Sequence, residues 1–304
     1  GWAWPAARSI GSIIWRLSHT AIFKWNNKKR EKAGAGEFPK QLQYNVPLEL
    51  MLSFFPIVFV MGLVFFIGQA KTRTTGLNMD PKVTVDVTGY QWNWKFGYAK
   101  VDGDLTANGQ DYDGADAERQ ANADETKYDP EDMPNANPIH GYSEGDISYL
   151  NFDKIETKGS TEEIPVLVLP TDTAIEFRLA SADVNHAFWV PEFLFKRDVY
   201  AHPENNQQQR TFQIERIEQT GAFVGRCAEM CGTYHSMMNF EVRAVTPDQF
   251  RDYMKFRAEN PDAPNSEALK AIGEEPYATT THPFGSDRTG TRDGENVNDP
   301  NATV

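Results

Sequence analysis

The stretch Cys227-Ala-Glu-Met-Cys231-Gly-Thr-Tyr-His235-Ser-Met-Met238 contains both cysteines of the 304-residue chain and one of its six histidines. Thiolate, imidazole and thioether groups are soft ligands, which suit copper better than hard cations. His186 lies upstream and could supply a second imidazole. This grouping predicts a metal site on a loop, and the surrounding sequence shows what kind of domain carries it.

The sequence around this loop has the pattern of β-strands. From Ile147 to Val245, short apolar runs recur with turn residues between them, which is the spacing of an all-β sandwich. Within 82–98, alternating valines at positions 83, 85 and 87 predict a half-buried strand. Trp92 and Trp94 follow on one face of the same run. We therefore expect the β domain to occupy 81–246.

A second feature is an uncharged run of twenty residues at 50–69. At a helical rise of about 1.5 Å per residue the run reaches roughly 30 Å, the hydrocarbon thickness of a bilayer. We predict a transmembrane helix over 47–70, with a buried helix of a soluble domain as the alternative. Residues 24–46 are basic and are expected on the cytoplasmic side. Residues 1–23 are apolar but interrupted by charge, so composition leaves open whether they form a first span of a membrane anchor over 1–80.

The charge is unevenly distributed along the chain. Residues 1–100 carry 13 basic and 5 acidic side chains, 101–150 carry 2 and 13, and 151–304 carry 15 and 25. An acidic surface repels phosphates, which argues against nucleic acid as a partner and favours a basic partner.

Two segments lie outside the expected strand pattern. The acidic segment 101–146 has no periodicity and predicts a long polar loop, either a docking surface or a solubilising loop. Thr246-Pro247 predicts the start of a C-terminal helix in 247–304, followed by an extended tail that wraps over a surface or stays mobile.

The metal hypothesis accounts for several residues together. Cys227 and Cys231 can each bridge two metal ions, and His186 and His235 can each serve one of them. Met238 and the Glu229 carbonyl are candidate axial donors. Three alternatives remain open: a disulfide, a structural zinc site, or cysteines and methionines that are simply core residues.

The motif resembles that of subunit II of haem–copper cytochrome c oxidases, which binds the dinuclear copper centre called CuA. The resemblance runs from about Glu49 to Val245, and the acidic insertion and long tail are similar to actinobacterial versions. It implies an all-β cupredoxin-like sandwich or barrel domain anchored by a two-helix hairpin. It also implies a ligand set in which the cysteines bridge both coppers, one site being completed by His186 and Met238 and the other by His235 and the Glu229 carbonyl.

The resemblance implies roles for further residues. Trp92 matches the tryptophan through which electrons arrive from cytochrome c, and Glu49 matches a carboxylate at the mouth of a proton pathway into subunit I. The Glu229 side chain matches a magnesium ligand at the interface with subunit I. Asp183 and Asp198 match acidic positions near the face on which the donor docks.

The function implied is that of an electron-accepting subunit of a respiratory oxidase in a bacterial plasma membrane, with the copper domain on the extracytoplasmic side. Electrons would come from a c-type cytochrome, either diffusing or tethered to a cytochrome bc complex within a supercomplex. They would pass to haem in subunit I, where O2 is reduced and protons are translocated. Nitrous oxide reductase and quinol oxidase subunits fit less well, because the chain has an apolar span and all six ligand positions. A copper-free or disulfide-bonded β domain that acts as an interaction subunit remains the alternative.

Overall fold

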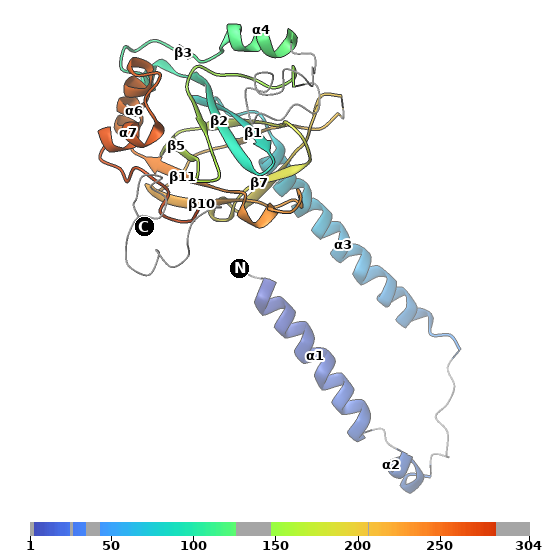
Figure 1. The fold of residues 1–304 in the computed structure, drawn as a ribbon. Coiled ribbons are helices and arrows are strands. Elements are labelled where there is room, and N and C mark those ends of the chain that lie inside the picture. Colours follow the sequence, from blue (N-terminus) through green and yellow to red (C-terminus); the bar gives the residue numbers. More distant parts are fainter. Residues whose placement is uncertain (1–2, 25–26, 35–42, 126–146, 206, 284–304) are drawn as a thin grey trace. The chain divides into compact units, whose positions relative to one another are not determined.

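The computed structural model describes residues 3–24, 27–34, 43–125, 147–205 and 207–283. The chain divides between Ile67 and Gly68 into two units (Figure 1). The first holds helices α1 (Ala3–Lys24) and α2 (Asn27–Lys32) and most of α3 (Val46–Thr75). The second holds all the described strands.

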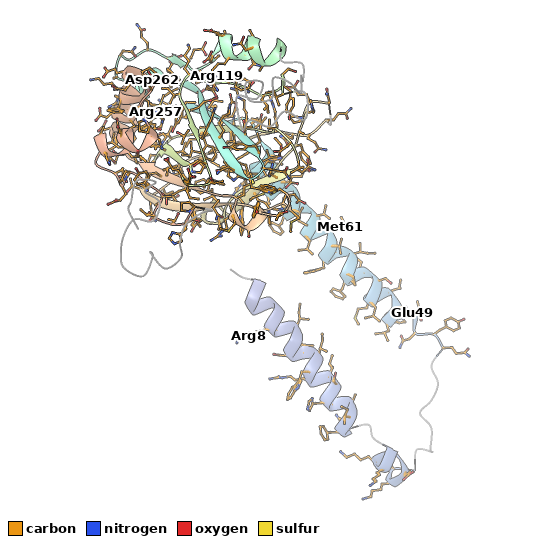
Figure 2. All side chains as sticks on the ribbon, in the orientation of Figure 1. Arg8, Glu49, Met61, Arg119, Arg257 and Asp262 are labelled. Carbon is orange, nitrogen blue, oxygen red and sulfur yellow. The ribbon has the colours of Figure 1, made fainter. Side chains whose placement is uncertain are left out.

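Helix α3 is the one helix among the described residues that is long and apolar enough to cross a membrane. None of its residues is buried, and large apolar side chains such as Met61 project from it (Figure 2). A helix that is apolar on all sides is suited to lipid rather than to water. The described part of the segment 1–23 belongs to α1, which does not meet the same criteria.

The second unit contains two sheets packed face to face (Figure 1). The first sheet has the order β3-β2-β1-β6-β9, with β4 also paired to β2, and the second has the order β5-β11-β10-β7-β8. Strands β1 and β6 are parallel, as are β11 and β5. The strand bounds are β1 Val83–Tyr90, β2 Asn93–Val101, β3 Tyr112–Asp113, β4 Glu156–Lys158, β5 Val166–Pro170, β6 Ile175–Ser181, β7 His186–Val190, β8 Phe195–Val199, β9 Thr211–Ile214, β10 Gly221–Cys227 and β11 Asn239–Val245. The predicted all-β sandwich is confirmed.

Aromatic side chains from both sheets form the centre of the core. Phe240 of β11 stacks on Phe188 of β7 at 4.8 Å between ring centroids, and meets Trp94 and Phe96 of β2 edge-on at 5.3 and 5.4 Å. All four are buried. Strand β7 begins with His186 and β11 begins directly after Met238, so this packing also positions candidate metal ligands.

The prediction that β1 is half-buried is wrong, because every residue of the strand is buried. The alternating valines face the core, while Thr84, Asp86 and Thr88 point to the other side of the sheet. That outer side is covered by residues that follow β2 and by the segment around Phe152. Asp86 is tolerated there because Arg178 of β6 binds both its carboxylate oxygens, at 2.8 and 2.9 Å.

The prediction of a long loop over 101–146 is wrong for its described part, residues 101–125. This part forms η1 (Gly103–Leu105), β3 and α4 (Ala117–Glu125). Leu105 is buried in the main core, and Ala123 packs in a smaller cluster with Leu150 and Phe152. A few well-spaced apolar residues thus anchor an otherwise polar segment. Residues 126–146 lie outside the described residues.

The predicted C-terminal helix is confirmed as α6 (Pro247–Glu259). Thr246 and Gln249 form a capping box, and Phe250, Tyr253, Met254 and Arg257 form its buried side. A second helix, α7 (Asn265–Ala271), was not predicted. The chain then covers β11, where the buried Glu241 accepts hydrogen bonds from the backbone of Thr279 and Thr280. Residues 284–304 lie outside the described residues.

Phe240→Ala should lower the free energy of unfolding by about 3–5 kcal/mol, because it removes the ring between the two sheets. The space left by the ring cannot easily be filled, because the residue beneath it, Gly225, has no side chain. Leu194→Ala is the control: Leu194 is 93% exposed, and its truncation should change stability by less than about 0.5 kcal/mol. Denaturant unfolding followed by tryptophan fluorescence measures both, and equal effects would contradict the packing described.

Candidate metal centre

The candidate ligands come from two neighbouring strands and the loop between β10 and β11. Cys227 is the last residue of β10 and His186 the first of β7, and these two strands pair. The loop closes through a hydrogen bond from the Cys227 N–H to the Met238 carbonyl, at 3.1 Å. Between them η4 (His235–Met237) turns the chain back toward β11. Residues far apart in sequence are thereby brought to one end of the sandwich.

The side-chain donors converge around the two sulfurs. Cys227 Sγ lies 3.7 Å from Cys231 Sγ and 3.9 Å from His186 Nδ1. Cys231 Sγ lies 3.5 Å from His235 Nδ1 and 3.7 Å from Met238 Sδ. Two ligand atoms held about 2.0–2.3 Å from one metal ion at a tetrahedral angle lie roughly 3.3–3.8 Å apart. These separations therefore fit donors that share metal ions.

The Glu229 carbonyl also faces the site. Its oxygen lies 3.2 Å from Cys227 Sγ, while the Glu229 side chain is exposed. The carbonyl is thus free to act as a ligand while the carboxylate points elsewhere. Both cysteines are free thiols, so the disulfide considered above is not formed.

His186 is oriented as a metal ligand needs. Its Nε2 lies 2.9 Å from Asp183 Oδ1, so Nε2–H donates to the carboxylate and Nδ1 faces Cys227, where it can bind a metal ion once its proton is lost. The imidazole is fully buried. Burial opposes its charged form, but hydrogen bonds to Asp183 and Cys227 outweigh this and raise the pKa of His186. The resemblance matched Asp183 to an acidic position near the docking face, which stays a prediction; the structure shows that the Asp183 carboxylate also orients a candidate ligand.

The two thiols differ strongly in acidity. The hydrogen bond from Cys231, followed by that from His186, holds the pKa of the Cys227 thiol far below its usual value, despite burial. The same neighbour and burial raise the pKa of Cys231. One thiolate is therefore favoured before any cation is bound, and a cation between the sulfurs favours both.

The β1–β2 turn packs on the cysteine loop. Gln91 Nε2 and Trp92 Nε1 both donate to the Cys231 carbonyl, at 2.8 and 3.0 Å. The Trp92 ring also meets Tyr234 edge-on at 4.9 Å between centroids. Trp92 is thus one hydrogen bond away from a candidate metal ligand. The role of Gln91 was missed from the sequence, and its place directly before Trp92 was the only signal.

Two other predicted residues lie in different surroundings. Glu49 is in the first turn of α3, where its Oε1 accepts a hydrogen bond from the Asn45 N–H at 3.2 Å. This is a helix-capping contact, and it leaves the second carboxylate oxygen for another partner. Asp198 of β8 accepts a hydrogen bond from the Tyr200 hydroxyl at 3.1 Å and is partly exposed.

Among the described residues, His186, Cys227 and Cys231 form the one histidine, cysteine and carboxylate group with ligand atoms close enough for a shared metal ion. A family model described as cytochrome c oxidase subunit II, periplasmic domain, matches residues 147–245. Cytochrome c oxidase subunit 2 of Corynebacterium glutamicum is 64% identical over 296 residues, which is 97% of this chain and 82% of the relative. The chain belongs to the cytochrome c oxidase subunit II family.

Two further comparisons give weaker likenesses. Cytochrome c oxidase subunit 2 of Mycobacterium tuberculosis is 49% identical over 290 residues, covering 93% of this chain and 76% of that protein. The crystal structure of the periplasmic domain of subunit II (CoxB) of Bradyrhizobium japonicum is 22% identical and has a TM-score of 0.35. It covers 60% of this chain and 97% of that chain. Membership of this family, together with the apolar helix α3, indicates a membrane-anchored subunit with an extracytoplasmic domain whose cysteine and histidine cluster can bind copper.

Gly232→Ala should disrupt the contact between the β1–β2 turn and the cysteine loop. Gly232 has φ +119°, and a Cβ atom there would lie 3.0 Å from Trp92 Nε1 and 3.1 Å from Gln91 Nε2. We expect a loss of about 1–3 kcal/mol of stability and a changed Trp92 indole N–H resonance. Gly273→Ala is the control, because it also has positive φ (+80°) but no atom within 4 Å of the added Cβ. An unchanged indole resonance in Gly232→Ala would contradict the contact.

Proposed function

We propose that this chain is the electron-accepting subunit of a respiratory cytochrome c oxidase and that it binds a dinuclear CuA centre. The observation that carries the proposal is the set of soft donors around the two sulfurs, each within 3.2–3.9 Å of Cys227 or Cys231. Zinc would fit the cysteines and histidines but would make little use of the buried thioether of Met238. Copper explains the full donor set.

In this proposal the cysteines bridge two copper ions, and the remaining donors are His186, His235, Met238 and the Glu229 carbonyl. When bound, the centre supplies one-electron redox chemistry. The protein holds the donors in place. Asp183 orients His186 through a hydrogen bond. The Met238 backbone carbonyl accepts a hydrogen bond from the Cys227 N–H, and the Met238 side chain packs in the core. A rigid, largely dry site needs little rearrangement when the charge of the centre changes.

Electrons would arrive by way of Trp92. Its indole N–H donates directly to the Cys231 carbonyl, which gives a short bonded route from the partly exposed ring to a bridging ligand. The donor in this proposal is a c-type cytochrome, either diffusing or tethered to a cytochrome bc complex. Electrons would leave by the His235 and Glu229 side toward haem in subunit I, where O2 is reduced and proton translocation is coupled to that reduction.

The anchor and the remaining residues complete the proposal. Helix α3 spans the bacterial plasma membrane over 47–70, with 24–46 inside and 81–246 outside, and α1 over 1–23 is the other helix of the hairpin. Glu49 lies at the mouth of a proton pathway, and the exposed Glu229 carboxylate binds Mg2+ against subunit I. The tail in 247–304 contributes α6 and α7 to the outer domain.

Copper loading of the full chain in detergent tests the centre. We expect a purple species whose electron paramagnetic resonance signal shows one unpaired electron shared by two copper ions. Met238→Leu should change that signal because it removes a buried thioether, whereas Met230→Leu, whose side chain is 73% exposed in the same loop, should not. A colourless protein with both thiols titratable would leave the chain as a copper-free interaction subunit.

Trp92→Phe tests the path by which electrons arrive. The variant keeps an aromatic ring but loses the N–H donor to Cys231, so copper binding should be unchanged while electron uptake from a c-type cytochrome slows by orders of magnitude. Trp189→Phe is the matched control, because Trp189 is partly buried in β7. Stopped-flow reduction of the copper centre measures both variants, and normal uptake in Trp92→Phe would remove Trp92 from the path.

A further inference from the structure

A second pocket lies away from the copper site, on the outer side of the first sheet. Its volume is about 670 Å³, and it lies between β1 and β6 on one side and residues 111–120 on the other. Its lining is strongly acidic. Lys100 and Arg178 are its two basic side chains, against six carboxylates: Asp86, Asp111, Asp113, Asp116, Asp153 and Glu176.

Asp153 is a buried carboxylate in this pocket, and one of its oxygens has no hydrogen-bond donor among the described residues. Its side chain is 1% exposed, and within the described part of the chain no donor reaches Oδ2. The carboxyl group rests against Gly97 of β2, where a Cβ atom would lie 2.1 Å from Oδ2. Asp86 shows the contrast, because both its oxygens are bound by Arg178.

A buried carboxylate without a donor is costly, because the charged form loses its hydration without replacement. Burial first, and then the charge of Asp86, raise the pKa of Asp153. Charged or polar groups approach it from each neighbouring element: Asp86 of β1, Lys95 of β2, Tyr112 of β3, Arg119 of α4, Glu156 of β4 and Arg178 of β6. The positive ones are already paired with Asp86 or Glu156.

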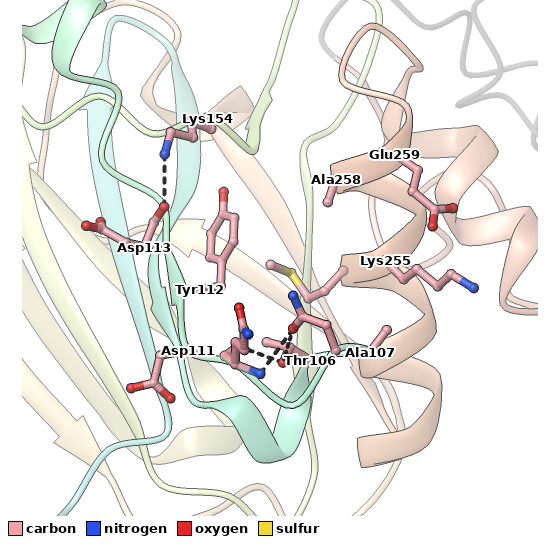
Figure 3. Close-up of a pocket in the computed structure, with 12 residues that line it drawn as sticks. Thr106, Ala107, Asp111, Tyr112, Asp113, Lys154, Lys255, Ala258 and Glu259 are labelled. Atoms are coloured by element: carbon pink, nitrogen blue, oxygen red, sulfur yellow. Dashed lines mark hydrogen bonds between the residues drawn. The ribbon is translucent and has the colours of Figure 1, made fainter.

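Tyr112 lies beside Asp153. Its hydroxyl is buried, and burial first, then the nearby Asp153, raise the pKa of Tyr112. Tyr112 separates this pocket from a neighbouring one of about 600 Å³ that is bordered by α6. In Figure 3 the carboxylates of Asp111 and Asp113 point away from α6, and both of these residues also line the acidic pocket. Asp153 Oδ2 and the buried Tyr112 hydroxyl thus lie beside several carboxylates.

We propose that this acidic pocket binds a hard divalent cation, calcium, with the Asp153 carboxylate as its buried ligand. Calcium accepts carboxylate, hydroxyl and water oxygens in irregular arrangements, and the pocket lining supplies carboxylates and the Tyr112 hydroxyl. Within the described residues, no three carboxylate oxygens of the pocket lie within 4.8 Å of one another, so the cation keeps water ligands. We therefore expect an affinity typical of extracellular modules, with a Kd of about 10⁻⁴–10⁻³ M.

A cation at this position would fasten the segment after β2 to the sheet. The backbone of this segment already meets residues 152–154 through Asp116 N–H to Phe152 O at 3.0 Å and Lys154 N–H to Gly114 O at 2.8 Å. Arg119 adds a hydrogen bond to the Asp153 carbonyl. Calcium would neutralise the carboxylates on both sides of this seam, so its binding should slow the opening of the seam.

Hydrogen exchange of the full chain in detergent tests the proposal, with CaCl2 compared against NaCl of matched ionic strength. At about 5 mM calcium and a Kd of about 0.5 mM, linkage predicts that exchange in 112–122 slows about tenfold. Asp153→Asn keeps the shape of the side chain but removes the ligand charge, so it should abolish the calcium effect. Asp262→Asn, an exposed acid between α6 and α7, should retain it (Figure 2).

Asp113→Asn provides a second test if Asp153→Asn does not fold. Its Oδ1 still accepts the Ala115 N–H, while the loss of a pocket charge should weaken the calcium effect. No calcium effect in the wild type would mean that Asp153 carries only a proton, which would overturn the proposal. A full effect in Asp153→Asn or Asp113→Asn would place the cation elsewhere and would also overturn it. These outcomes do not depend on whether copper is bound.

Discussion

The carbonyl oxygen of Cys231 is the point at which the two sheets are joined at the copper end of the domain. Gln91 and Trp92, from the first sheet, both donate to it, while Cys231 itself belongs to the loop of the second sheet. Two donors on one carbonyl fix the direction of that peptide, and with it the direction of the sulfur. Gly232 makes the approach sterically feasible. The geometry of the whole donor set depends on this contact.

The aromatic core also restricts the positions of the donor residues. Trp94 follows Trp92 on β2 and packs on Phe240, and its indole N–H lies 3.4 Å from the carbonyl of Met238. Gly89 allows the His186 ring to lie directly against β1, since a Cβ atom there would be 2.9 Å from Cδ2. Loop, ring and strand are therefore packed as one unit. Such packing restricts side-chain motion, which is what the proposed electron-transfer site would need.

The candidate metal ligands and the apolar span could be predicted from the sequence more reliably than the burial of individual strands. The cysteine loop, His186 and the apolar span were recognisable because their residue types are rare in such spacing. The contact of Asp183 with His186 was missed because a surface acid and an acid that orients a histidine look alike in sequence. Burial of β1 on both faces was missed because the alternation of valine with Thr84 and Asp86 is also the pattern of a strand open to water. Only the tertiary contact with Arg178 makes that aspartate compatible with burial. Helix α7 was missed because a seven-residue helix among prolines and asparagines has almost no periodic signal.

The two candidate metal sites of the β domain offer different kinds of ligand atoms and therefore suit different metal ions. At one end, sulfur and imidazole donors lie together in a largely buried site, and soft ligands of this kind bind calcium poorly. On the outer face of the first sheet, carboxylates and a phenol hydroxyl line a pocket, where copper would find no thiolate. The sandwich lies between the two sites. Because Val85 and Val87 face the core while Asp86 faces the acidic pocket, a single strand contributes to both surroundings by alternation alone. The period of two that defines a β-strand therefore also keeps the core side of β1, toward the proposed copper site, apart from its outer side, toward the proposed cation pocket.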